Sequence, residues 1–287
     1  MDFAEVRRLT VTALFADDEL VEKLVLKGGN ALSLVHRLSP RASLDLDFSI
    51  EEDFDDLEDI RQRVFRTLKN RFDSAGYVVF DESLQPKPRL EGQDERPWWG
   101  GYELRFKLIS REKYDLWRDA PEKRRFNALV VGFNQQRTFT VHFSKHEYTQ
   151  GKVERDLDYY TIYVYTPAMV AVEKLRAICQ QMPVYFLKGQ RRPRARDFFD
   201  IHLVVTKAAV DLASPENLEL IRNIFAAKLV PLALLGGVGA QREFHRPDWP
   251  AVVASVGEPL EEFDHYFDFV VNQVERLKTL WEEQPPL

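Results

Sequence analysis

Cysteine is almost absent from this sequence, and that scarcity excludes whole classes of protein. Cys179 is the single cysteine among 287 residues. A disulfide framework and a cysteine-based metal cluster are therefore excluded. Cys179 itself is most simply a small buried apolar residue, and we expect the chain to belong in a reducing compartment.

Long apolar runs and a secretory leader are also missing. No stretch approaches the roughly 20 apolar residues that a membrane-spanning helix needs. The first residues, MDFAE, carry acids where a signal peptide carries basic and then apolar residues. We therefore expect a soluble, cytoplasmic protein with no membrane partner.

Positive charge is not in excess either. The 40 lysine and arginine residues face 46 acids, which gives a net charge of −6. A uniformly basic nucleic-acid coat is thus excluded, and any contact with nucleic acid must come from local patches. The 45% of hydrophobic residues is typical of a core-forming chain, and the length allows two domains.

Residues 24–50 contain the most informative pattern. The apolar residues 24–26 predict a short buried strand, Gly28 and Gly29 end it, and the spacing of NALSLVHRL predicts a helix from that point. Glycines let a ligand approach backbone N–H groups, and the N-terminus of a helix attracts anions. This order of elements predicts a phosphate site.

An alternating segment, LDLDF at residues 44–48, follows the glycine turn. Alternation predicts a strand with Asp45 and Asp47 on one face. Two carboxylates placed this way could hold a divalent metal beside the phosphate. Each half alone is more often an ordinary turn or solvated strand decoration, so the prediction depends on the combination.

Together, the two motifs resemble the signature of the polymerase-beta-like nucleotidyltransferase superfamily. The segments KGGNAL and RASLDLDF are similar to the motifs of the AbiEii/AbiGii-type toxins of abortive-infection toxin–antitoxin systems. The resemblance implies an α/β (α+β) fold, with a mixed sheet and helices in a nucleotidyltransferase domain at residues 1–160. A mainly helical domain at 161–287 would complete the active-site cleft.

The resemblance also implies roles for individual residues of the first motif. Asp45 and Asp47 would be catalytic and would hold Mg²⁺ or Mn²⁺. The residues that bind the nucleoside triphosphate would be Gly28, Gly29, Asn30, Arg41 and Ser43. Asn30 departs mildly from the family, in which a serine or threonine is usual.

Two motifs of the second half extend the resemblance. Thr166 and Pro167 predict the start of a helix that contains AVEKLRA, and RDFFDI follows at residues 196–201. By default Lys174 is a solvated lysine, and Asp197 and Asp200 are structural acids that share one helix face. The resemblance implies instead that these residues, with Arg196, serve the site. Lys174 and Asp200 would be catalytic, and Arg196 and Asp197 would bind the nucleotide.

One strand departs from the family. His142 stands in the alternating segment RTFTVHFS, where the resemblance implies a third acid. A lone histidine on such a strand is usually structural. Either the two-metal arrangement is incomplete, or Glu103 or an acid of the second half supplies the missing carboxylate. We expect Asp200 to do so.

The remaining elements are simpler to predict. We expect helices at 3–15 and 60–72, and a helical region from 207 onward around a glycine-rich break at 235–239. Strands are expected at 77–80, 102–109, 127–133, 137–144 and 160–165. The basic segment Lys188 to Arg196 should be a flexible loop that gathers an RNA backbone. Trp98 and Trp99 lie in a long loop, and we expect a functional reason for any exposure of their side chains.

The resemblance implies a nucleotidyltransferase toxin of a phage-defence system. It would transfer a nucleoside monophosphate from an NTP to an RNA 3′ end, and family members imply the acceptor end of tRNA. A cognate antitoxin is the implied protein partner. Two alternatives stay open: a protein hydroxyl as acceptor, and a degenerate, non-catalytic RNA- or protein-binding domain, for which His142 is the evidence.

Overall fold

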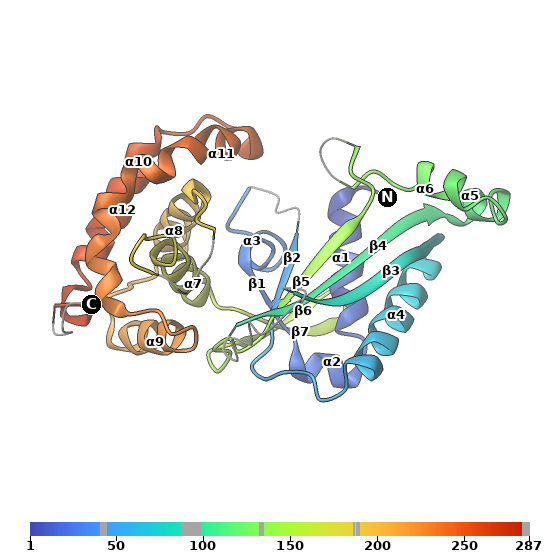
Figure 1. The fold of residues 1–287 in the computed structure, drawn as a ribbon, viewed down its shortest axis with the longest axis horizontal. Coiled ribbons are helices and arrows are strands. Elements are labelled where there is room, and N and C mark those ends of the chain that lie inside the picture. Colours follow the sequence, from blue (N-terminus) through green and yellow to red (C-terminus); the bar gives the residue numbers. More distant parts are fainter. Residues whose placement is uncertain (41–44, 88–98, 132–134, 186, 188–189, 283–287) are drawn as a thin grey trace. The chain divides into compact units, whose positions relative to one another are not determined.

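A computed structural model describes residues 1–40, 45–87, 99–131, 135–185, 187 and 190–282. The chain forms two compact units (Figure 1). Unit 1 contains Met1–Gly28 and Ser43–Val164, and unit 2 contains Gly29–Ala42 and Tyr165–Leu287. The chain passes from one unit to the other within α3 (Gly28–Asn30).

Unit 1 is built on one mixed sheet. Within the described residues it has seven strands in the order β3-β4-β5-β2-β1-β7-β6. The β2–β5 and β1–β7 pairs are parallel and the others are antiparallel, so the predicted mixed α/β class is confirmed. The strands are β1 (Val25–Lys27), β2 (Leu46–Ser49), β3 (Tyr77–Lys87), β4 (Gly101–Ser110), β5 (Phe139–Ser144), β6 (Val153–Leu157) and β7 (Tyr160–Val164).

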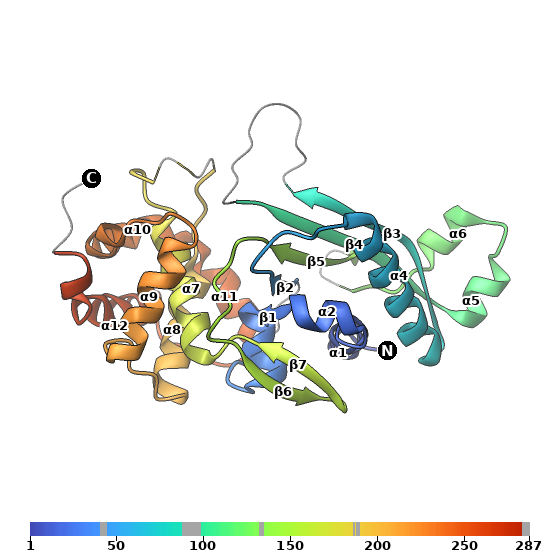
Figure 2. The same cartoon turned by 90° about the horizontal axis from the view of Figure 1, so that it is seen from below.

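Helices α1 (Phe3–Leu14) and α4 (Leu57–Ser74) pack on each other and cover one face of the sheet (Figures 1 and 2). The alternation of β5 explains this, because Phe139 and Phe143 are buried while His142 and Ser144 are only half-buried. Aromatic pairs join the helices to that apolar face: Phe3 with Phe139, Phe15 with Phe48, and Phe72 with Phe106. The opposite face is left for polar side chains.

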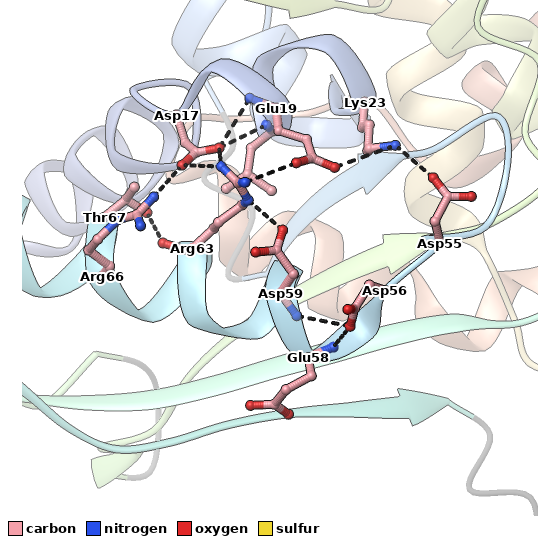
Figure 3. Close-up of polar contacts among 11 residues, drawn as sticks. Asp17, Glu19, Lys23, Asp55, Asp56, Glu58, Asp59, Arg63, Arg66 and Thr67 are labelled. Atoms are coloured by element: carbon pink, nitrogen blue, oxygen red, sulfur yellow. Dashed lines mark hydrogen bonds and ion pairs between the residues drawn. The ribbon is translucent and has the colours of Figure 1, made fainter.

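An ion-pair network joins α2 (Asp18–Lys23) to α4 (Figure 3). Asp17 caps α2 by accepting from the backbone N–H groups of Glu19 and Leu20. The same buried carboxylate accepts from Arg63 and Arg66 of α4. The basic side chains Arg63 and Arg66 of α4 therefore pair within the molecule.

The predicted strand at 127–133 is not formed by its described residues, 127–131. Ala128 instead packs into a small apolar cluster with Phe80 and Ile109, and the Leu129 N–H donates to the carbonyl of Leu108. Within this loop Ala128 and Val131 are buried, whereas Val130 is exposed. The polar connection before it forms two short helices at the end of β4, α5 (Arg111–Leu116) and α6 (Pro121–Phe126) (Figure 1).

Unit 2 is helical. Its core is α7 packed on α8, with α9 against α7 and with α11 and α12 against α8 (Figure 2). The expected glycine-rich break lies within a 3-10 helix, Leu232–Gln241. The other helices are the π-helical turn Ala31–Val35, α7 (Pro167–Cys179), α8 (Ala195–Lys207), α9 (Pro215–Ala226), α10 (Arg242–His245), α11 (Trp249–Val256), α12 (Phe263–Glu275) and the 3-10 turns Arg246–Asp248 and Lys278–Leu280. Among the described residues, no helix is long and apolar enough to cross a membrane.

Candidate active site

A row of polar residues crosses four neighbouring strands of unit 1. Strand register places Lys27 opposite Asp47, Asp47 opposite His142, and His142 opposite Glu103. Residues directly opposite one another share a face of the sheet. The row therefore lies on the face that α1 and α4 do not cover.

Gly28 lies against Asp47. The backbone of Gly28 is left-handed, with φ +68°, and a Cβ added there would be 3.2 Å from Asp47 Oδ2. Both the turn and this close approach require glycine. In unit 1 the glycine turn and the second aspartate of the motif are thus neighbours.

Asp45 and Asp47 alternate with buried apolar residues as predicted. Asp45 is exposed just before β2 begins, Leu46 is buried, Asp47 is half-buried and Phe48 is buried. Both carboxylates therefore lie on the polar face of this part of the chain. Arg41 and Ser43, also predicted to bind the nucleotide, lie outside the described residues.

Glu103, one candidate for the missing acid, is bound to cations. Its carboxylate is 2.6 Å from Lys87 Nζ and 2.5 Å from Arg105, and His142 Nδ1 lies 3.7 Å away. Burial alone would raise the pKa of Glu103, but the hydrogen bond and charge of Lys87 outweigh it and hold the pKa below its ordinary value. Glu103 is thus an ionised partner of Lys87 and Arg105.

Lys27 is a residue that sequence reasoning missed. Its ammonium is buried and lies 3.2 Å from Glu147 Oε1, which is buried as well. A buried lysine requires such a partner, because an uncompensated charge is costly in the interior. A lysine at the end of an apolar strand, next to the glycine turn, was the available signal.

The second and third motifs meet in unit 2. Thr166 caps α7 by accepting from the Met169 N–H, as predicted. Lys174 is buried, with Nζ 2.7 Å from Asp200 Oδ2 and 3.1 Å from Asp197 Oδ1. The default of a solvated lysine is therefore wrong, and Asp197 and Asp200 share the predicted face of α8.

Arg194 completes this cluster. Its Nε donates to the second oxygen of Asp197. Burial alone would raise the pKa of Asp197, but the charges of Arg194 and Lys174 outweigh it and hold the pKa well below the ordinary range. The cluster is thus a fixed arrangement of ionised groups around the Lys174 ammonium.

His245, which sequence reasoning missed, binds the backbone of Arg194 in this cluster. Its Nδ1 accepts from the backbone N–H of Arg194 at 3.0 Å, and the ring is fully buried. Burial lowers the pKa of His245 to about 4. The ring is therefore neutral, and it holds the first residue before α8.

The remaining residues that were predicted to bind the nucleotide or RNA differ in burial. Gly29 and Asn30 are buried, and Arg196 is exposed at the start of α8. The described part of the basic segment is held to unit 2 rather than loose. Arg191 donates to the Gln181 carbonyl, and the Arg192 N–H donates to Gln181 Oε1 at 2.9 Å.

The structure therefore assembles two sets of predicted residues. Gly28 lies against Asp47 in unit 1, with Asp45 two residues before Asp47 in the chain, and Lys174, Asp197 and Asp200 are in contact in unit 2. Their roles in binding a phosphate ligand stay a prediction.

Comparison with known families identifies the family of this chain. The model of the family described as nucleotidyl transferase AbiEii toxin, type IV TA system, matches residues 12–272. The chain belongs to this family of nucleotidyltransferase toxins. The resemblance inferred from the motifs is confirmed.

Solved structures give weaker likenesses. A protein from H. pylori described as a nucleotidyltransferase is 17% identical, with a TM-score of 0.47, over 99% of this chain and 97% of its own. An antigenic nucleotidyltransferase-like protein from Paracoccidioides brasiliensis is 14% identical, with a TM-score of 0.36, over 87% and 93% of the two chains. A search of curated proteins found no match.

Proposed function

We propose that this protein transfers a nucleoside monophosphate from an NTP to the 3′ end of an RNA. The acceptor hydroxyl oxygen forms a bond to the α-phosphorus, and its proton passes to solvent water. The bond from the α-phosphorus to its bridging oxygen breaks, and pyrophosphate leaves. Such a reaction depends mainly on positioning and charge neutralisation.

The approach of Gly28 to Asp47 is the observation that carries the proposal. A phosphate held by the N–H groups of the glycine turn would lie next to the Asp47 carboxylate. Like charges cannot share such a place unless a cation joins them. The turn therefore suits a phosphate that arrives with a divalent metal.

The acids present fit a metal carried by the nucleotide. The described residues contain no group of three or more side chains that could hold a metal by themselves. Mg²⁺ commonly takes one or two carboxylates and completes its shell with substrate phosphates and water. Asp45 and Asp47 would hold it, and Mg²⁺ or Mn²⁺ would neutralise charge on the triphosphate.

Lys174 is the proposed cationic contact for the triphosphate. Asp197 and Asp200 hold its ammonium at 3.1 and 2.7 Å, which fixes its position before any ligand binds. A positioned charge is more effective than a mobile one because no reorganisation is needed. Asp200 therefore acts at least through Lys174, and its role as the third metal ligand stays a prediction.

The proposal extends to the acceptor, the protein partner and the biological setting. The acceptor end of a tRNA would be the RNA, a cognate antitoxin the partner, and phage defence by abortive infection the setting. Membership of a type IV toxin–antitoxin family supports the antitoxin and the NTP. The reaction would take place in the cytoplasm.

One experiment separates this function from its alternatives. The protein is incubated with each of the four α-labelled NTPs, Mg²⁺ and total cellular RNA, with and without a chelator. Label in RNA that the chelator abolishes is the expected result. Label in protein would identify a protein nucleotidylating enzyme, and no label with any NTP would favour the non-catalytic binding domain.

A further inference from the structure

Unit 1 contains a buried ion pair between Lys27 of β1 and Glu147, a residue of the segment that follows β5. The distance from Lys27 Nζ to Glu147 Oε1 is 3.2 Å, and only 6% and 5% of the two side chains are exposed. A buried pair adds little to stability, because removing two charges from water costs about as much as their attraction returns. The effect of the pair on neighbouring charges is therefore the more informative property.

Lys27 is the cross-strand neighbour of Asp47. The β1–β2 register sets the two residues directly opposite each other. Side chains in such positions share one face of the sheet and have Cβ atoms about 4.5–5.5 Å apart. Lys27 thus brings a positive charge close to a carboxylate that the proposed function assigns to a divalent metal. A positive charge there competes with the metal for Asp47.

Backbone bonds fix Glu147 in place. Its N–H donates to the carbonyl of Ile50 at 3.2 Å, and the Ile50 N–H donates to the carbonyl of Ser144 at 2.9 Å, so the segment is attached to the end of β2. His146, just before it, has φ +56°, a left-handed conformation that costs free energy in a residue with a side chain. The position of the Glu147 carboxylate therefore does not depend on Lys27 alone.

We propose that Glu147 is a positioning residue of the metal site, because it holds Lys27 and offsets the charge that Lys27 brings close to Asp47. The inference rests on the proposed function, since it assumes that Asp47 binds a divalent metal. The pair of Lys27 and Glu147 has no net charge, so Asp47 keeps its attraction for the metal. Without Glu147, the ammonium is uncompensated in the interior and turns to the carboxylate opposite it.

The test compares Glu147→Gln, Lys27→Met and the double variant with the wild type. Glutamine keeps the size of glutamate and removes its charge, and the double variant removes both charges of the pair. Glu51→Gln is the matched control. Glu51 accepts from Thr149 Oγ1 at 2.6 Å and from Gln150 Nε2, so it binds the same segment without belonging to the pair.

Three readouts are needed. The Kd of Mn²⁺ alone is measured on the full chain from the electron paramagnetic resonance signal of free Mn²⁺. The Mg²⁺ concentration that gives half-maximal label transfer to RNA is the second, and the melting temperature is the third. Asp47→Asn identifies the part of Mn²⁺ binding that belongs to the proposed site.

We expect Glu147→Gln to raise the Kd of Mn²⁺ and the half-maximal Mg²⁺ concentration at least about ten-fold, the smaller end of what a cation within about 4–6 Å does to proton binding by an aspartate. The double variant should return both values to the wild-type range, because no lysine then lies opposite Asp47. Lys27→Met should bind Mn²⁺ at least as tightly as the wild type, and Glu51→Gln should match it.

An unchanged Kd in Glu147→Gln would overturn the inference. A double variant as weak as Glu147→Gln would do the same, because it would show that the pair serves only the fold. If Glu147→Gln does not fold, the double variant decides, since it leaves no buried charge uncompensated. Wild-type affinity for Mn²⁺ in the double variant then supports the role of Glu147, and a loss of about ten-fold overturns it.

The same measurements separate this inference from the proposed function. If Mn²⁺ binding does not depend on Asp47, the metal site fails and the role of Glu147 fails with it. If Mn²⁺ binding depends on Asp47 but not on Glu147, the metal site stands and only the role of Glu147 is wrong. If Mn²⁺ binding depends on both residues and no label enters RNA, the role of Glu147 stands and the transferase proposal fails.

Discussion

The left-handed turn at Gly28 brings its backbone against the carboxylate of Asp47, with a hypothetical Cβ at 3.2 Å from Oδ2. A side chain at this position would therefore press on Asp47, one of the two proposed metal ligands. Gly76 provides a control, because its φ is +79° and nothing lies within 4 Å of a Cβ placed there. Both glycines are left-handed, and a methyl group would meet Asp47 only at Gly28.

We predict that Gly28→Ala and Gly76→Ala each lower the free energy of unfolding by about 1–2 kcal/mol, the cost of an L-residue in the left-handed region. Only Gly28→Ala should reduce nucleotide transfer, by ten-fold or more, because its methyl group displaces Asp47. Denaturant unfolding and the labelled-NTP assay measure the two effects. Equal transfer by both variants would remove Gly28 from the site.

The proposed third carboxylate ligand, Asp200, predicts which of two substitutions reduces activity more. Asp200 is fully buried against Lys174, whereas His142 is half-buried beside Glu103. We expect Asp200→Asn to reduce kcat about as much as Asp47→Asn, and His142→Gln to cost little. An inactive His142→Gln together with an active Asp200→Asn would return the third ligand to β5 and leave Asp200 a structural role.

Stability should depend on pH through His245. Burial holds the pKa of His245 at about 4, below the ordinary value near 6.5, so the unfolded chain binds an extra proton between those values. The free energy of unfolding therefore falls as pH drops through this window, by about 2 kcal/mol between pH 7 and pH 5 for this residue alone.

His245→Asn isolates that contribution. The amide oxygen of asparagine can replace Nδ1 as the acceptor for the Arg194 N–H, and the side chain does not titrate. We expect the variant to lose about 2 kcal/mol of the difference in unfolding free energy between pH 7 and pH 5. Urea titrations at the two pH values give the answer. An unchanged difference would mean that the buried ring is not the titrating group.

The basic segment before α8 should contact RNA phosphates. Arg191 and Arg192 are exposed, whereas Arg194 must be left intact because it pairs with Asp197. We predict that changing Arg191 and Arg192 to alanine lowers the salt slope of RNA binding by about 1.4, roughly 0.7 for each lost phosphate contact on a single strand. Arg222→Ala, which removes an exposed arginine of α9, is the control. Equal slopes would place RNA elsewhere.

The sequence predicted the features that depend on neighbouring residues in the chain, such as helix starts and the alternation of strands. The start of α7 at Pro167 follows from the Thr166 cap, and the alternation around Asp47 follows from the pleat of β2. The same reasoning singled out the glycine turn and the pair Asp45 and Asp47, because their chemistry lies in short segments. Lys174, Asp197 and Asp200 were singled out only by the family resemblance.

Burial and contacts that depend on residues far apart in the sequence could not be predicted from local patterns. Lys174 is buried only because Asp197 and Asp200 of another helix neutralise it, and nothing within α7 signals this. The apolar pattern at residues 127–131 belongs to a loop whose Ala128 packs against β3 and β4, which a pattern of one segment cannot distinguish from a strand. The neighbours of Asp47 likewise depend on the order of strands.

The most direct test of the account is the transfer of α-labelled nucleotide to RNA by the wild type and by Asp45→Asn and Asp47→Asn. Both substitutions keep the size of the side chain and remove one charge, so the melting temperature should change little. The account predicts metal-dependent labelling of RNA by the wild type and a loss of at least 100-fold, about 2.7 kcal/mol in the barrier, in each variant. Labelling of RNA at the wild-type rate by either variant would contradict it.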